Sequence, residues 1–131
     1  MKTMILRALV VWIVIIVVET IHGIVRQKFI TPALGDLLAR QIGVFVGSVL
    51  ILAITWLFVD WLHAYSFKSK IAIGLLWCAL TFAFEVLLGL SLGFSVQRII
   101  ADYDLAQGGF MLFGMIILAF SLLIVSKFRG D

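Results

Sequence analysis

The sequence predicts an all-α integral membrane protein, folded as a bundle of four transmembrane helices. Of its 131 residues, 64% are hydrophobic and only 13% are charged, and the mean hydropathy is +1.25. A soluble domain has about 25% charged residues, so this composition favours residence in a bilayer. Because each crossing needs about 20 apolar residues, the chain has room for four helices with short connections. We therefore expect a single membrane domain over residues 1–131.

The predicted transmembrane helices cover residues 5–25, 41–62, 71–96 and 108–126. The second is the clearest, because residues 42–59 carry no charge, and the third is interrupted only by Glu85. No small-residue cleavage site follows the first apolar run, so we expect a retained helix there and not a cleaved signal peptide.

The polar connections carry signals of their own. Thr31 followed by Pro32 is typical of a helix start and predicts a short interfacial helix between the first two spans. Asp36 and Asp104 are placed to cap the helical segments that follow them.

The distribution of Lys and Arg predicts the orientation. The side that holds both chain ends has six cationic residues and the opposite side has four: Lys2, Arg7, Lys68, Lys70, Lys127 and Arg129, against Arg26, Lys28, Arg40 and Arg98. An excess of cations marks the cytoplasmic side, so we expect both termini in the cytoplasm, with the protein in a bacterial inner membrane. Nucleic-acid binding is not expected, because the cations are divided between the two membrane faces.

The chain partly repeats itself after 66 residues. The shift aligns five pairs of polar residues or glycines: Glu19 with Glu85, Gly23 with Gly89, Asp36 with Asp102, Gln41 with Gln107, and Gly43 with Gly109. These residue types are scarce in the chain, so the matches predict a bundle built from two parallel-repeat helical hairpins. A pseudo-twofold axis along the membrane normal would bring the two glutamates to similar depths. The alternative is that generic helical hairpins align at some offset.

The main candidate site is a group of polar residues inside the bilayer. Glu19, His22, Gly23 and Arg26 follow a spacing that puts them on one face of a helix. An ionisable group near the bilayer centre costs about 2.5–3.5 kcal/mol on insertion scales and indicates function by default. We therefore predict a ligand- or proton-binding site. Its predicted members are Glu19, His22, Glu85, Gln41, Gln107 and Arg26. The alternative is that these side chains only hydrogen-bond between helices and so stabilise assembly.

A metal site is a second interpretation of the same residues. The Glu19-x-x-His22 spacing matches the ligand pair of di-iron helical bundles, but Leu88 stands where the second His would be. A single metal held by Glu19, His22 and Glu85 stays open. Cys78 is the only cysteine, so neither an intrachain disulfide nor a cysteine metal site is expected.

Glycines at helical spacing predict close helix packing. Gly43 and Gly47 in the second helix, and Gly89 and Gly93 in the third, form small-x-x-x-small patterns that let backbones approach. We expect Gly23 in the first helix to serve the same purpose.

Taken together, these residues predict a small multipass membrane protein that binds or transports a proton, a cation or a small solute. The alternatives are an accessory subunit of a larger membrane complex and a metal-binding redox protein. An enzyme is not favoured, because the sequence contains no P-loop, Rossmann glycine pattern or nucleophile elbow. No catalytic residue and no cofactor beyond the candidate metal is indicated. The expected partners are the lipid bilayer and either a second copy of the chain or a membrane-complex partner.

Overall fold

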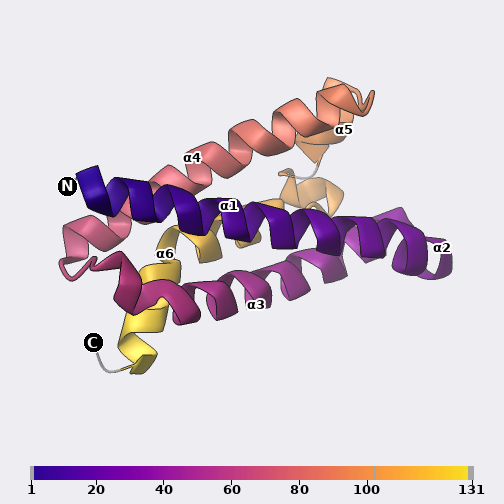
Figure 1. Cartoon of the computed structure of the whole chain (residues 1–131). Coiled ribbons are helices and arrows are strands. Elements are labelled where there is room, and N and C mark those ends of the chain that lie inside the picture. The colour runs from indigo at the N-terminus through magenta and orange to yellow at the C-terminus, as the bar shows by residue number, and fades with distance from the viewer. Residues whose placement is uncertain (1, 102, 130–131) are drawn as a thin grey trace.

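The structure is a computed structural model that describes residues 2–101 and 103–129. Within those ranges it is helical, without strands, and four helical segments are long and apolar enough to cross a membrane. The four long helices are α1 (Lys2–Val25), α3 (Asp36–Leu62), α4 (Phe67–Ser91) and α6 (Met111–Arg129) (Figure 1). The prediction of an all-α chain with four spans is confirmed.

The first span is longer than the predicted 5–25 segment. From α1 the chain continues through a π-helical turn, η1 (Arg26–Ile30), into the short helix α2 (Thr31–Leu34). Gly35, with φ of +88°, ends this run, and α3 begins directly after it at Asp36. The short helix at Thr31-Pro32 is therefore present, but it is joined to α1, and Ile30 occupies its N-cap position without a side-chain hydrogen bond.

The third span ends at Ser91, five residues before the predicted boundary at Val96. Gly93 adopts a left-handed backbone with φ of +85°. The backbone N–H of Phe94 donates to the carbonyl of Gly89 at 2.9 Å, which is the hydrogen bond of a glycine-terminated helix end. Gly93 therefore lies outside the helix and terminates it, so it does not share a packing face with Gly89.

The second connection between spans contains two short elements, α5 (Val96–Ala101) and the 3₁₀ turn η2 (Leu105–Gln107). Asp104 accepts a hydrogen bond from the backbone N–H of Ala106 at 3.0 Å, so its predicted capping role is confirmed at η2. Because α5 and η2 differ in conformation from the η1–α2 connection, the two hairpins are not joined alike internally. The internal repeat stays a prediction.

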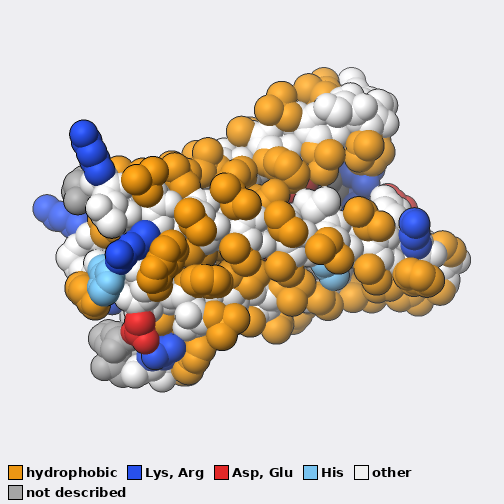
Figure 2. Space-filling model, in the orientation of Figure 1, with side chains coloured by type: hydrophobic (Ala, Val, Ile, Leu, Met, Phe, Trp, Pro, Cys, Tyr) orange, Lys and Arg blue, Asp and Glu red, His pale blue; other side chains and the backbone are white. Residues whose placement is uncertain are grey.

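Large apolar side chains cover the outside of the bundle, as lipid-facing side chains do. In Figure 2 they cover most of the visible face, while charged side chains gather near the two ends and in a notch beside α4 and α5. Phe45 and Leu57 on α3 and Leu87 on α4 are among the most exposed. This surface is what four membrane-spanning helices require.

The main cluster of buried apolar side chains lies in one half of the bundle. We call this the proximal half, since it contains both ends of the chain; it comprises residues 2–15, 51–77 and 118–129. The apolar side chains packed in the core are Ala8, Val11, Ile15, Ile51, Ile54, Val59, Leu62, Ala64, Ile73, Trp77, Leu118, Leu122 and Val125. The Trp77 indole is fully buried, and its N–H donates to the carbonyl of Ala8 at 2.9 Å. Gly74 of α4 lies directly against the backbone of Ala119 in α6, so no side chain separates the two helices there.

The helices diverge in the other half, which we call the distal half, residues 16–50 and 78–115. There α4 leans away from α1 and α3, and the gap between α4 and α1 widens toward α5 (Figure 1). The polar and aromatic contacts between α1 and α4 stop early. They include the Trp77–Ala8 hydrogen bond, the hydrogen bond from the Trp12 indole to Thr81 Oγ1 at 3.0 Å, and the edge-on contact of Trp12 with Phe84.

Candidate intramembrane site

A cavity of about 520 Å³ lies in the distal half of the bundle, where the helices diverge. Its lining comes from α1, α3, α4 and α6 and from the connections at that end of the molecule. Most of the lining is apolar, and the exceptions include Glu19, His22 and Glu85. The spacing on α1 and the lean of α4 thus leave all three residues lining one cavity.

The polar face of α1 lies over the two predicted packing glycines of α3. A methyl group added at Gly47 would lie 2.8 Å from Glu19 Oε2. One added at Gly43 would lie 3.1 Å from Arg26 Nη1 and 3.7 Å from His22 Cε1. Both glycines are buried. Their role is therefore different from the expected backbone-to-backbone packing, because the missing side chains leave room for a carboxylate, an imidazole and a guanidinium.

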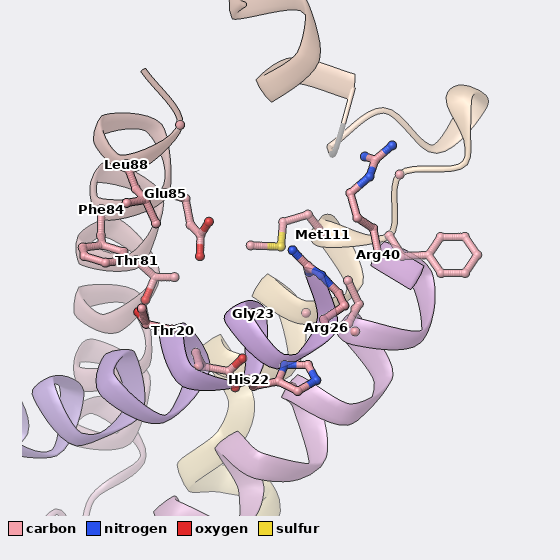
Figure 3. Close-up of a pocket in the computed structure, with 18 of the residues that line it drawn as sticks. Thr20, His22, Gly23, Arg26, Arg40, Thr81, Phe84, Glu85, Leu88 and Met111 are labelled. Atoms are coloured by element: carbon pink, nitrogen blue, oxygen red, sulfur yellow. The ribbon is translucent and has the colours of Figure 1, made fainter. Parts of the chain in front are cut away.

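Glu85 approaches the same cavity from the opposite wall. Figure 3 shows Glu85 on α4 and Arg26 at the start of η1 pointing into one space, with Met111 of α6 between them. Glu19 experiences the electrostatic fields of both residues, repulsive from Glu85 and attractive from Arg26. The two glutamates are thus electrostatically linked across the cavity, and Arg26 partly offsets their repulsion.

Two charged side chains of the lining have buried polar atoms without a hydrogen-bond partner. They are Oε1 of Glu19 and Nε of Arg26, and neither side chain forms a salt bridge among the described residues. Buried polar atoms of native proteins almost always have a partner, so such exceptions mark a place for water, an ion or a ligand. One is an acceptor and the other a donor, so the cavity offers both to an incoming molecule.

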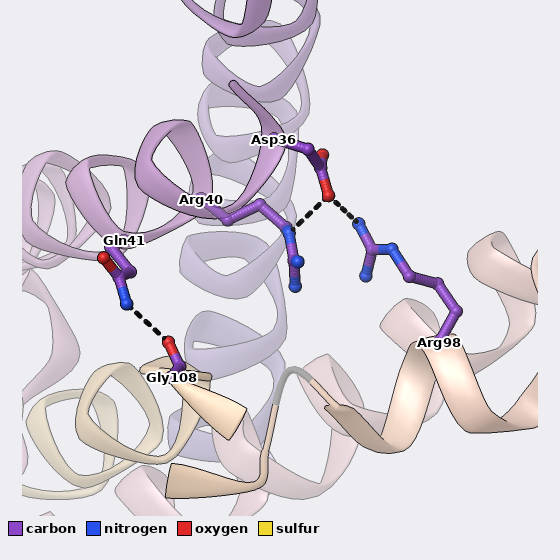
Figure 4. Close-up of polar contacts among 5 residues, drawn as sticks. All are labelled: Asp36, Arg40, Gln41, Arg98 and Gly108. Atoms are coloured by element: carbon purple, nitrogen blue, oxygen red, sulfur yellow. Dashed lines mark hydrogen bonds and ion pairs between the residues drawn. The ribbon is translucent and has the colours of Figure 1, made fainter. Parts of the chain in front are cut away.

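Charged and amide side chains connect the elements at the distal mouth of the cavity. Arg40 Nε donates to Asp36 Oδ2 at 3.0 Å, and Arg98 Nη2 lies 3.7 Å from the same oxygen, so one carboxylate joins α3 to α5 (Figure 4). Gln41 Nε2 donates to the carbonyl of Gly108 at 2.8 Å, which ties α3 to the segment before α6. Gln41 therefore lines the site but its amide nitrogen is already engaged in holding the mouth together.

The remaining predicted residues fall in several places. The side chain of Gln107 and the whole of Asp102 lie outside the described part of the structure. Gly23 lines the cavity, and a methyl group there would meet no atom within 4 Å, so it does not serve close packing. Gly89 is buried against Ile99 of α5, 3.0 Å from where a Cβ would lie, so its packing role is supported within the chain.

The structure does not assemble the candidate metal ligands. Among the described residues there is no group of three or more His, Cys, Asp or Glu side chains arranged to hold a metal ion. Glu19 and His22 lie against α3, whereas Glu85 projects from α4 on the far side of the cavity. The metal-binding interpretation therefore finds no support in this geometry.

Several lining residues could not have been selected from the sequence. Thr81 lies one helical turn before Glu85 and is held by the Trp12 indole. Phe84, Met111 and Met115 supply much of the apolar wall. Only Thr81 gave a signal, as a hydroxyl within an apolar span and in register with Glu85; the other three are indistinguishable in sequence from lipid-facing residues.

Comparisons with protein-family models, with curated proteins and with solved structures find no match for this chain. The class of protein is therefore inferred from the fold alone. Four apolar helices of spanning length, with apolar side chains outside and a partly polar cavity between them, are the architecture of an integral membrane protein.

Proposed function

We propose that this protein binds a proton or a small solute in the cavity between Glu19 and Glu85 and moves it across the membrane. The observation that carries the proposal is the buried, unpartnered Oε1 of Glu19, which lies in a membrane-spanning helix and is electrostatically linked to Glu85. A carboxyl group in such a place can take up and release a proton or bind a ligand, and intramembrane carboxyls commonly form relays of this kind.

The charge pattern supports a coupling of the two glutamates. Repulsion disfavours two ionised carboxylates facing one cavity, so the uptake of a proton by one of them is favoured. His22 and Arg26 have no counterpart in the second half of the chain, since a shift of 66 residues aligns them with Leu88 and Leu92. This asymmetry gives the two walls different chemistry, which directional movement through the site requires.

Flux measurements in liposomes test the proposal. Purified protein would be reconstituted with a trapped pH indicator, and a potassium diffusion potential would drive proton entry. We expect a protein-dependent flux that is lost in the Glu19→Gln/Glu85→Gln double variant. Asp60→Asn is the matched control, because Asp60 lies at the proximal end and is exposed. Flux that is unchanged in the double variant would overturn the proposal.

The same proposal includes a bacterial inner-membrane location with both termini in the cytoplasm. It is supported by the six cationic residues at the proximal end against four at the distal end. Reporter domains fused to the C-terminus, one active only in the cytoplasm and one only outside it, would test the orientation.

A role as an accessory subunit has one observation in its favour. An apolar hollow of about 320 Å³ lies between α4 and α5, lined by side chains that include Phe82, Leu90 and Val96. A helix of a partner protein could pack there. In that case a stoichiometric partner would co-purify with the chain, and Leu90→Trp, which fills the hollow, would abolish the association. A chain that purifies alone and supports flux would refute this alternative.

A further inference from the structure

A notch beside α4 and α5 opens on the side of the bundle, next to the cavity of the distal half (Figure 2). In the proximal half, the Trp77 and Trp12 hydrogen bonds close the seam between α1 and α4. Beyond Phe84 the two helices separate, and the notch between them is open on the side of the bundle (Figure 2). Leu88, on the α4 edge of this notch, lines the cavity and is also exposed. A molecule dissolved in the bilayer therefore has a path to the site that avoids water.

The polar side of the cavity carries more positive than negative groups. Lys and Arg contribute four lining residues and Asp and Glu contribute two: Arg26, Lys28, Arg40 and Arg98, against Glu19 and Glu85. Arg40 and Arg98 both contact Asp36. The guanidinium of Arg26 stands apart, since it has neither a salt bridge nor a hydrogen bond among the described residues and its Nε is buried.

The Nε of Arg26 is buried without a hydrogen-bond partner, although Glu19 attracts its charge, and an acidic group that bound Arg26 would supply the missing partner. Guanidinium groups match the planar geometry of carboxylates and phosphates and bind them through paired hydrogen bonds. Arg26 lines the cavity, and its side chain points toward the space that Glu85 also faces (Figure 3). An acidic head group that reaches it must therefore have entered the cavity.

The apolar walls accept a hydrocarbon chain. Phe84 and Leu88 of α4 line the cavity together with Met111, Met115 and Leu118 of α6. The volume of about 520 Å³ lies within the range of pockets that hold drug-sized ligands. Methionine side chains adapt to flexible ligands, which suits a chain without a fixed shape.

We propose that the cavity binds an anionic amphiphile that enters from the bilayer between α1 and α4. Its acidic head group pairs with Arg26, and its hydrocarbon chain lies along Phe84, Met111 and Met115. This inference rests on the proposed function in taking the same cavity as the ligand site, and it assigns the solute class. The glutamates then act beside the head group, where a proton on Glu19 removes the competing attraction between Glu19 and Arg26.

Binding of palmitate to the protein in nanodiscs tests this inference, with a photoactivatable analogue to locate the chain. Arg26→Gln is expected to weaken palmitate binding about tenfold or more. Arg7→Gln, the matched loss of an arginine from the proximal end of α1, should leave the affinity unchanged. Cross-links are expected on residues 84–88 and 111–115. Circular dichroism of each variant would verify that the helices are retained, and Arg26→Lys should restore part of the affinity if the charge is what matters.

Other ligands distinguish the sources of the acidic group. Acetate and inorganic phosphate carry the negative charge but no hydrocarbon chain. At concentrations equal to that of palmitate, they should not displace palmitate from the protein. Competition by either would mean that a free anion is the ligand and would overturn the amphiphile. Equal binding of hexadecyltrimethylammonium, or unchanged palmitate binding in Arg26→Gln, would also overturn it. These readouts do not involve flux, so a failure here is separate from a failure of the Glu19/Glu85 proposal.

Discussion

Gly74 of α4 lies directly against the backbone of α6 and offers the sharpest test of the packing. A methyl group added there would overlap the backbone carbonyl of Ala119 in α6. A backbone cannot turn aside as a flexible side chain can, so Gly74→Ala must push the two helices apart. Overpacking of a core costs about 1–3 kcal/mol, and we expect the upper end of that range because the obstacle is a helix backbone.

Gly23→Ala is the matched control, since a methyl group at Gly23 meets no atom within 4 Å. Both substitutions gain the same helix propensity of alanine over glycine, about 1 kcal/mol, so the difference between them reports crowding alone. We expect Gly74→Ala to be less stable than Gly23→Ala by about 2–3 kcal/mol. That difference is about a 30- to 140-fold change in the unfolding equilibrium constant.

Unfolding by SDS in mixed micelles, followed by far-UV circular dichroism, would measure the difference. Tryptophan fluorescence provides a second probe, because Trp77 lies three residues from the substitution and is fully buried. Equal midpoints for the Gly74 and Gly23 variants would refute the close approach of α4 and α6, and with it the division of the bundle into a packed half and a hollow half.

Three further predictions follow from individual contacts. Gly47→Ala places a methyl group 2.8 Å from Glu19 Oε2, so it should displace that carboxyl and lower flux about tenfold or more. The free energy of unfolding in SDS should change by less than about 1 kcal/mol. Normal flux in this variant would contradict the position of the Glu19 carboxyl against Gly47. A double-mutant cycle of Trp12→Phe and Thr81→Val should give a coupling free energy of about 0.5–1.5 kcal/mol, from the 3.0 Å hydrogen bond between them, and additive effects would mean that this bond does not stabilise the fold. Arg129→Gln removes a 2.7 Å salt bridge to an exposed partner and should cost no more than about 1 kcal/mol in the same unfolding assay, so a larger loss would show that this contact does more than join two surface charges.

The membrane spans could be predicted from the sequence because hydropathy is a property of each segment by itself. The ends of the spans depend on single residues, and the predicted ends were less accurate. Gly93 looked like half of a packing pattern, yet it ends α4 because a left-handed backbone is needed there. Gly35 likewise sets the start of α3, five residues before the predicted boundary.

The candidate site could be predicted only in part. The helical spacing of Glu19, His22 and Arg26 indicated a shared face, and they do line one cavity. What the sequence could not reveal is the angle of α4, which results from packing between distant residues such as Gly74 and Ala119. Without that angle the sequence cannot reveal the cavity, or that Gly43 and Gly47 lie against charged side chains of the first span.

The uneven core has a mechanical consequence. The proximal half is packed around Trp77 and the distal half is hollow. The helix α4 is therefore fixed by packing at one end and has few neighbours at the other. Glu85 lies eight residues beyond Trp77, about 12 Å along the helix. A tilt of about 10° around the packed end would therefore carry the Glu85 carboxyl by roughly 2 Å. Backbone amides of residues 82–91 should exchange with solvent deuterium faster than those of residues 70–78, because local opening starts where buried contacts are few.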